Sequence, residues 1–186
     1  SSYAQAAAMA MGRAMDDVII TAASATAFTG ETGATSTAAQ TAIAAGGAGL
    51  TIAKLRTAKQ TFDLASVDPS IPRHIVVGPE QITNLLSTTE VTSSDFNTVK
   101  ALVQGEIDSF LGFKFTVSNR LAKSGNDRTC LAFAQDGITL AIGKDVSARI
   151  DERADKSYAT QVYYCQSIGA TRMEEAKVLG IVCQEA

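Results

Sequence analysis

The sequence contains no tryptophan, a single histidine, three prolines and three cysteines among its 186 residues. The cysteines, Cys130, Cys165 and Cys183, are odd in number and nowhere form a CxxC pair, so we expect free thiols rather than disulfides or a metal site. The histidine, His74, has no serine, cysteine or carboxylate beside it in the sequence, which favours a structural role over catalysis. Hydrophobic runs are interrupted well before the roughly 20 apolar residues of a membrane span, so no membrane partner is expected.

Neither sign of charge is concentrated along the chain. The sequence has 16 basic and 19 acidic residues and a net charge of -3, without a basic stripe that would neutralise a row of phosphates. Asp16-Asp17 and Glu174-Glu175 are adjacent in sequence, so their side chains point in different directions on a helix or strand and make poor acid-base pairs. The sequence therefore predicts no enzyme, no catalytic residue, no metal site and no cofactor.

Residues 2–27 predict one long amphipathic helix, because they contain no proline and their apolar residues recur at helical spacing. At 1.5 Å per residue the helix would be roughly 40 Å long. A helix of that length cannot bury its apolar stripe against a small globule, so we expect it to lie across an extended sheet or at an oligomer interface. The stripe consists of Ala4, Ala8, Met11, Met15, Val18, Ile19 and Ala22.

Residues 28–49 are rich in Thr, Ala and Gly and predict a flexible linker. The glycines near its end precede a helix, but the lysine of a phosphate-binding loop is absent, so no nucleotide site is expected. Thr51 is expected to cap the next helix, which ends before Pro69. A buried strand at 74–77 and a helix that begins at Gly78-Pro79 should follow.

Two further strands are expected in this region, at 113–117 and 130–134, because apolar residues alternate or cluster between turn-forming residues. The periodicity of residues 138–143, ITLAIG, does not separate strand from helix, and we expect a short helix there. Residues 158–170 and 178–183 are rich in β-forming residues and predict strands.

The final strands are expected to form one antiparallel sheet, with the N-terminal helix packed on it. The predicted fold class is therefore α+β, with a discontinuous first domain. Residues 1–27 and 145–186 form an elongated lobe, residues 28–49 form the linker, and residues 50–144 are inserted as a compact mixed lobe.

Three stretches of the sequence carry a family resemblance: RHIVVGPEQ from Arg73, TEVTSSDFNTVKALVQGEIDSFLGFKF from Thr89 and IDERADKSYATQVYYCQSIGATRMEE from Ile150. In this order they resemble the major capsid proteins of tailed bacteriophages and prophages, which have the Hong Kong 97-type fold. The resemblance implies a peripheral domain, in which a long spine helix lies along a sheet, at residues 1–27 and 145–186. It also implies an inserted mixed α/β axial domain at residues 50–144, which gathers around the axis of each hexamer or pentamer.

The resemblance also implies a function and partners. The chain is expected to self-assemble into the icosahedral shell of a phage head in the host cytoplasm, with possible scaffold, portal and decoration proteins and weak, non-specific contact with packaged DNA. Members of the family normally have an N-terminal arm and an extended loop before the spine helix; this chain opens in that helix, so an N-terminally truncated member is expected. Two alternatives remain, the shell protein of a cargo-holding nanocompartment and a virion-associated binding module.

Two short charged segments near the C-terminus are candidates for contacts between subunits. Both mix positive and negative side chains, and opposite charges on symmetry-related copies would fix their register, although a solvated loop would have the same composition. The candidate subunit-interface residues are Arg149, Asp151, Glu152, Arg153, Asp155, Lys156, Arg172, Glu174 and Glu175.

Overall fold

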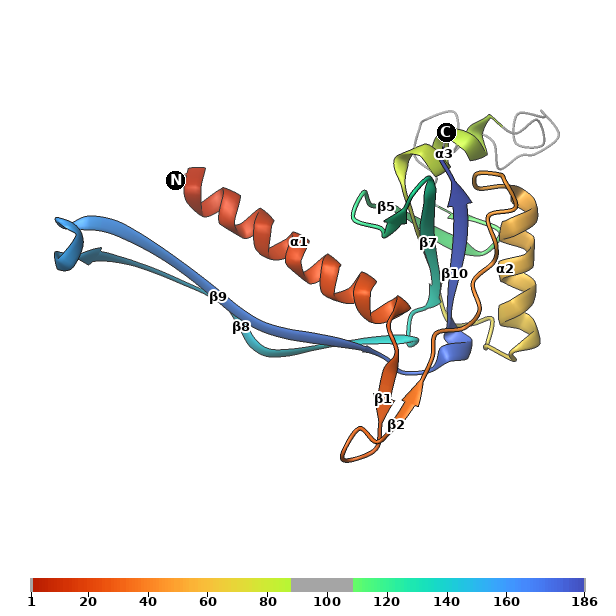
Figure 1. Ribbon diagram of the computed structural model, residues 1–186, viewed down its shortest axis with the longest axis horizontal. Helices are drawn as coiled ribbons and strands as arrows, with labels where there is room; N and C mark the ends of the chain where they lie inside the picture. The colour runs from red at the N-terminus through yellow and green to blue at the C-terminus, as the bar shows by residue number, and fades with distance from the viewer. Residues whose placement is uncertain (1, 88–108, 186) are drawn as a thin grey trace.

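In a computed structural model, which describes residues 2–87 and 109–185, the chain forms a body with a long arm. The arm is a two-stranded antiparallel ribbon of β8 (Ile138–Arg153) and β9 (Ala159–Arg172), and α1 (Ser2–Ser24) runs beside it (Figure 1). Most of the second stretch that carries the family resemblance, residues 89–108, lies outside the described residues.

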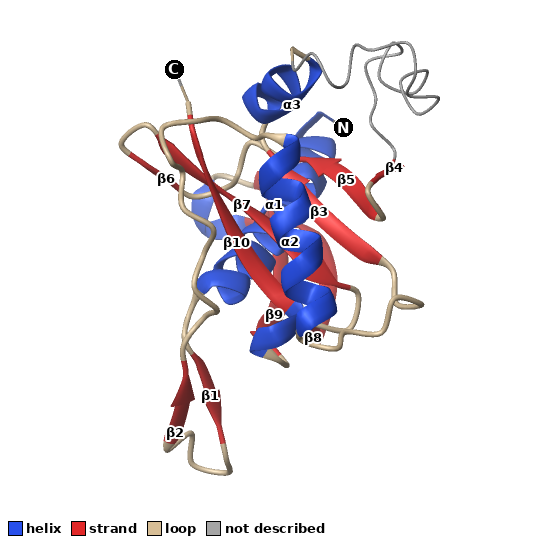
Figure 2. Ribbon diagram, turned by 90° about the vertical axis from the view of Figure 1, so that its right-hand side faces the viewer, coloured by secondary structure: helices blue, strands red, loops and turns tan. Residues whose placement is uncertain are grey.

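The body is built on a mixed six-stranded sheet. Its strand order is β10-β7-β3-β5-β4, with β6 paired to β7, and only β3 and β5 are parallel. Helix α2 (Ile52–Leu64) packs on one face of this sheet, and α3 (Pro79–Leu86) lies at the same end of the body as the C-terminus (Figures 1 and 2). The strands are β3 (Arg73–Val77), β4 (Ser109–Phe110), β5 (Phe113–Val117), β6 (Lys123–Ser124), β7 (Asp127–Ala134) and β10 (Val178–Gln184).

The local signals expected in the body are confirmed. The Thr51 hydroxyl accepts a hydrogen bond from the backbone N–H of Lys54, which caps α2. Pro79 occupies the first turn of α3, where its missing N–H costs nothing. Gly112 enters β5 with a φ of +84°, a conformation that strongly favours glycine.

Helix α2, the sheet and the segment that precedes α2 meet in the core of the body. The side chains of Leu55 and Phe62 on α2 are fully buried against the sheet, and the rings of Phe62 and Phe113 lie 6.0 Å apart between centroids. Lys54 is also buried, and its ammonium group donates to the carbonyls of Ala48 at 2.7 Å, Gly49 at 2.8 Å and Val182 at 3.0 Å. This lysine joins α2 to β10 and to the segment before α2, because each carbonyl comes from the backbone of those parts.

The segment 28–49 is not the free linker that we expected. β1 (Ala27–Thr29) and β2 (Thr35–Thr37) form a short antiparallel hairpin that projects from the body (Figure 2). Further on, Ile43 bridges to β10: its N–H donates to the carbonyl of Gly180 at 2.9 Å, and its carbonyl accepts from Val182 at 2.8 Å. The segment is held in place because the outer edge of β10 offers it backbone hydrogen-bond partners.

The prediction of a short helix at 138–143 is wrong, because these residues form the beginning of β8. Ile138 to Ile142 pair with residues 172 to 168 of β9. Each of these β8 residues acquires a cross-strand neighbour, and this pairing outweighs the helix propensity of Leu and Ala. The boundary predicted between residues 144 and 145 falls inside this strand.

The last strand also differs from expectation. β10 does not join the arm; it pairs with β7 over its whole length, from Val178 opposite Phe133 to Gln184 opposite Asp127. Its side chains explain the difference, since the adjacent residues Val178 and Leu179, which point to opposite faces of the strand, are both buried. A strand that is apolar on both faces needs cover on both faces, and the open two-stranded arm cannot supply it.

The helix-on-sheet arrangement of the elongated lobe is confirmed. Along β9, Tyr164, Ile168 and Ala170 are half-buried, whereas the alternate residues Ser167 and Gly169 are exposed. The buried side therefore faces α1, and the side-chain amide of Gln166, on the same side, donates to the carbonyl of Met11 at 3.4 Å.

The C-terminal end of the chain is anchored by a buried carboxylate. Glu185 is 3% exposed, and it accepts hydrogen bonds from Arg128, Lys123 and the Gln81 side-chain amide, the last at 3.1 Å. The Arg128 and Lys123 donors lower the pKa of this carboxyl group from its ordinary 4.5 to about 2.

We predict that Glu185→Gln lowers the free energy of unfolding by about 1–3 kcal/mol at pH 7, since it leaves charged donors without their acceptor. Because the folded-state pKa is depressed, the stabilisation by Glu185 is fully present above pH 4.5 and is lost as the pH falls toward 2. Urea unfolding at pH 7 and pH 3 measures both effects. The pH 7 loss should exceed that of exposed Glu175→Gln, and equal losses would contradict the assignment.

Candidate subunit-contact surface

One of the nine candidate interface residues is used by the fold itself. The side chain of Arg172, at the end of β9, is buried, and its guanidinium donates to the carbonyls of Ala23 at 3.2 Å, Ala25 at 2.7 Å and Thr37 at 2.9 Å. The first two carbonyls lie at the C-terminal end of α1, where a positive charge is favourable, and the third belongs to β2. We therefore correct the prediction for Arg172: its charge holds the arm, the helix and the hairpin together and is not available on the surface.

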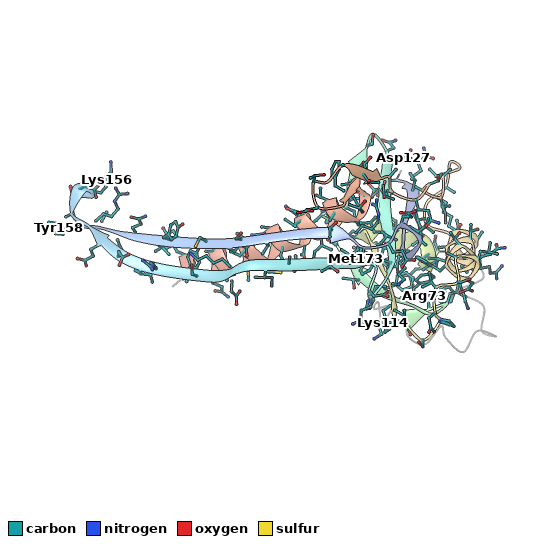
Figure 3. All side chains as sticks on the ribbon, turned by 90° about the horizontal axis from the view of Figure 1, so that it is seen from below. Arg73, Lys114, Asp127, Lys156, Tyr158 and Met173 are labelled. Carbon is teal, nitrogen blue, oxygen red and sulfur yellow. The ribbon has the colours of Figure 1, made fainter. Side chains whose placement is uncertain are left out.

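The first charged segment, residues 149–156, lies on the outer half of the arm, far from the body. Figure 3 shows Lys156 and Tyr158 at the free end of the arm, opposite Arg73, Lys114 and Asp127 in the body. Residues 148–163 are all exposed, including Tyr158 at 72%. An exposed ribbon of this length is surface that the monomer does not use for its own core.

The end of the arm is shaped by a local ion pair. A turn of 3-10 helix, Ala154–Lys156, follows β8, and the Arg153 Nε donates to the Asp155 Oδ1 at 2.9 Å. Ser157 and Tyr158 then adopt left-handed backbone conformations with φ of 53° and 59°. This conformation costs a non-glycine residue about 1–2 kcal/mol, so the turn presents Tyr158 in a defined but strained position.

The second charged segment lies at the base of the arm, next to the body. The Lys177 ammonium group lies 2.6 Å from an Asp136 carboxylate oxygen and 3.0 Å from a Glu174 carboxylate oxygen. Both hydrogen bonds raise the pKa of Lys177, and the bond to Asp136 has the larger effect. Glu174 is therefore tied to the turn between β7 and β8, and Glu175 next to it is exposed.

The structure thus divides the candidates by their contacts. Arg172 is buried, Arg153 pairs with Asp155, and Glu174 pairs with Lys177. Within residues 2–87 and 109–185, five exposed candidates have no side-chain hydrogen bond or ion pair: Arg149, Asp151, Glu152, Lys156 and Glu175.

Two of these five share one face of the arm. Arg149 lies opposite Tyr163 and Asp151 opposite Gln161, and all four line a polar hollow of about 330 Å³ together with Lys144 and Ser147. Tyr163 and Gln161 alternate with the β9 residues that face α1, so this face points away from the helix.

The same face carries the half-buried thiol of Cys165. Its sulfur lies 3.0 Å from the Ser147 hydroxyl, and hydrogen bonds from Ser147 and Lys144 lower the pKa of the thiol.

No cluster of three or more metal-ligating side chains occurs among the residues that the structure describes, and no described helix is long and apolar enough to span a membrane.

Where the arm meets the body, α1 and the sheet enclose an apolar groove of about 260 Å³, lined by Ile19, Ile20, Val117, Phe133 and others. An exposed ion pair connects the two parts beside it: the guanidinium of Arg120 donates to the carboxylate of Asp17, and this hydrogen bond lowers the pKa of Asp17. Sequence reasoning missed this contact, because the two residues are 103 positions apart.

Comparisons with known proteins agree with this architecture. The family model described as "Phage capsid protein" matches residues 1–185. Solved structures with a similar fold include a chain of Mycobacterium phage Che8 (22% identity, TM-score 0.68), the capsid of the cyanophage P-SCSP1u (16%, 0.65) and the capsid of an empty GTA particle (14%, 0.69). These alignments cover 96%, 98% and 98% of this chain but only 61%, 66% and 65% of the respective structures, and no curated protein matches the sequence.

A long helix on a two-stranded arm, joined to a mixed-sheet body, is thus the fold of phage capsid subunits, and the fold expected from the sequence is confirmed. The chain belongs to the phage capsid protein family, whose model matches it from the first residue to residue 185.

We predict that Arg172→Ala lowers the free energy of unfolding by at least about 2 kcal/mol, because three backbone carbonyls lose a charged donor. Urea unfolding measures the loss, and hydrogen exchange should show faster exchange at the C-terminal turn of α1 and in β1–β2. Arg149→Ala, on the exposed arm, is the matched control and should change stability by less than about 0.5 kcal/mol. Similar losses for both variants would disprove the anchoring role of Arg172.

Proposed function

We propose that this chain is the shell-forming part of a major capsid protein of a tailed phage or prophage. The proposal is supported by the family match over residues 1–185 together with the exposed arm, where Arg149, Asp151, Glu152 and Lys156 have no side-chain partner within the described residues. A subunit of this kind works by contact with other copies of itself, so its function is structural rather than catalytic.

The expected partners follow from that role. Other copies come first, as hexamers and pentamers of a closed shell. Scaffold, portal and decoration proteins are further candidate partners, and the net charge of -3 favours weak, sequence-independent contact with packaged DNA. We expect assembly in the cytoplasm of the host bacterium and a final location in the capsid of the virion.

The exposed candidates of the arm and its base are proposed as subunit contacts: Arg149, Asp151, Glu152, Arg153, Asp155, Lys156, Glu174 and Glu175. Both signs of charge occur side by side in this set, so identical copies can present opposite charges to one another. The axial and peripheral domains of the family are proposed to correspond to the body and to the arm with α1.

We predict that the product of the full gene, expressed alone and pelleted from a lysate, forms uniform closed shells in negative-stain electron microscopy. The same particles should contain nucleic acid after infection or induction and lack a packaged cargo protein. Shells filled with a cargo protein would instead identify a nanocompartment. A protein that stays monomeric with and without the neighbouring scaffold gene would contradict the shell function and favour a virion-associated binding module.

A further inference from the structure

The face of the arm that points away from α1 carries two opposite charges that have no partner within the described residues. Arg149 and Asp151 are two positions apart on β8, so their side chains project from the same face. Both are exposed, and both line the polar hollow described above. The backbone pairing of the arm fixes their positions, because Arg149 lies directly opposite Tyr163 and Asp151 directly opposite Gln161 on β9.

This pair of charges is complementary to the same pair on a second copy of the chain. If two arms stack with these faces together and run antiparallel, a twofold axis can pass between positions 149 and 151. Arg149 of each copy then faces Asp151 of the other, and one rotation creates two ion pairs. Stacked sheets lie about 10 Å apart, a gap that an arginine and an aspartate side chain span together.

The residues around the charges suit such a contact. Tyr163, opposite Arg149, is 51% exposed, and Gln161 adds an amide beside Asp151. In the antiparallel arrangement Tyr163 of one copy lies over Gln161 of the other, so an exposed aromatic ring becomes covered and its hydroxyl group meets an amide. Parallel stacking of the same faces would not bring Arg149 onto Asp151, so the charges also select the orientation.

We propose that this face of the arm, defined by Arg149, Asp151, Gln161 and Tyr163, binds the same face of a second copy of the chain about a twofold axis. The inference rests on the proposed shell function and specifies one contact that such a shell would contain. Its occupant is a second copy because the charge pattern is self-complementary.

Charge reversal tests the pairing. Arg149→Asp places two negative charges opposite two others, and Asp151→Arg does the same with positive charges. We expect each single variant of the full-gene protein to reduce the yield of shells at least about tenfold, because like charges face each other across the contact. Arg149→Asp combined with Asp151→Arg exchanges the two charges, recreates both ion pairs and should restore assembly.

A mixture of the two single variants provides the sharpest control. An Arg149→Asp copy has two negative charges on this face and an Asp151→Arg copy has two positive ones, so the mixture can form complementary pairs that neither variant forms alone. Coexpression should therefore restore shells that contain both variants, measured by electron microscopy and mass spectrometry. Rescue of this kind cannot come from a variant that fails to fold.

The outcomes separate this inference from the proposed function. Normal wild-type shells together with folded single variants that assemble equally well would overturn the arm pairing alone. The same holds for a double variant or a mixture that assembles no better than the single variants. Wild-type protein that forms no shells with or without scaffold would overturn the proposed function and, with it, the pairing.

Discussion

The arrangement of the molecule depends on the bonds that one buried guanidinium makes to three backbone carbonyls. Arg172 lies where β9 returns to the body, and its donors reach the end of α1 at Ala23 and Ala25 and the hairpin at Thr37. The carbonyls of Ala23 and Ala25 lie at the C-terminal end of α1, where the last turn of a helix leaves its carbonyls without partners inside the helix. One side chain therefore connects helix, arm and hairpin at the place where they leave the body.

The hydrogen bonds of Arg172 hold only the base of the arm, and the rest of the arm depends on other contacts. The ribbon gains the support of α1 on one face, through residues such as Ile168 and Tyr164, while the other face stays open. The outer part of the arm, residues 148–163, is exposed and buries no core of its own. An isolated two-stranded ribbon is only marginally stable in water. Surface of this kind is suited to the contacts with other copies that are proposed above.

Much of the fold was predictable because it depends on short-range signals. The cap at Thr51, the proline at the start of α3 and the alternating pattern of β5 each act within a few residues, and all three appear as expected. The three failures in the fold concern pairing, and the first is the segment 28–49, which formed a hairpin and bridged to β10 instead of remaining a free linker. Residues 138–143 became a strand and β10 moved to the body, since a strand's partner lies far away in the sequence and its burial decides where it goes.

The sequence by itself determined the α+β composition, the long helix and the charged character of the arm, because composition, periodicity and capping are local properties. The class of protein came from the resemblance of three stretches of the sequence to phage capsid proteins. Only the tertiary structure decided which charges are free. Arg172 and Arg149 look alike in the sequence, yet one is buried against three carbonyls and the other has no side-chain partner within the described residues. The difference arises from contacts across about 150 residues of chain, which no local pattern records.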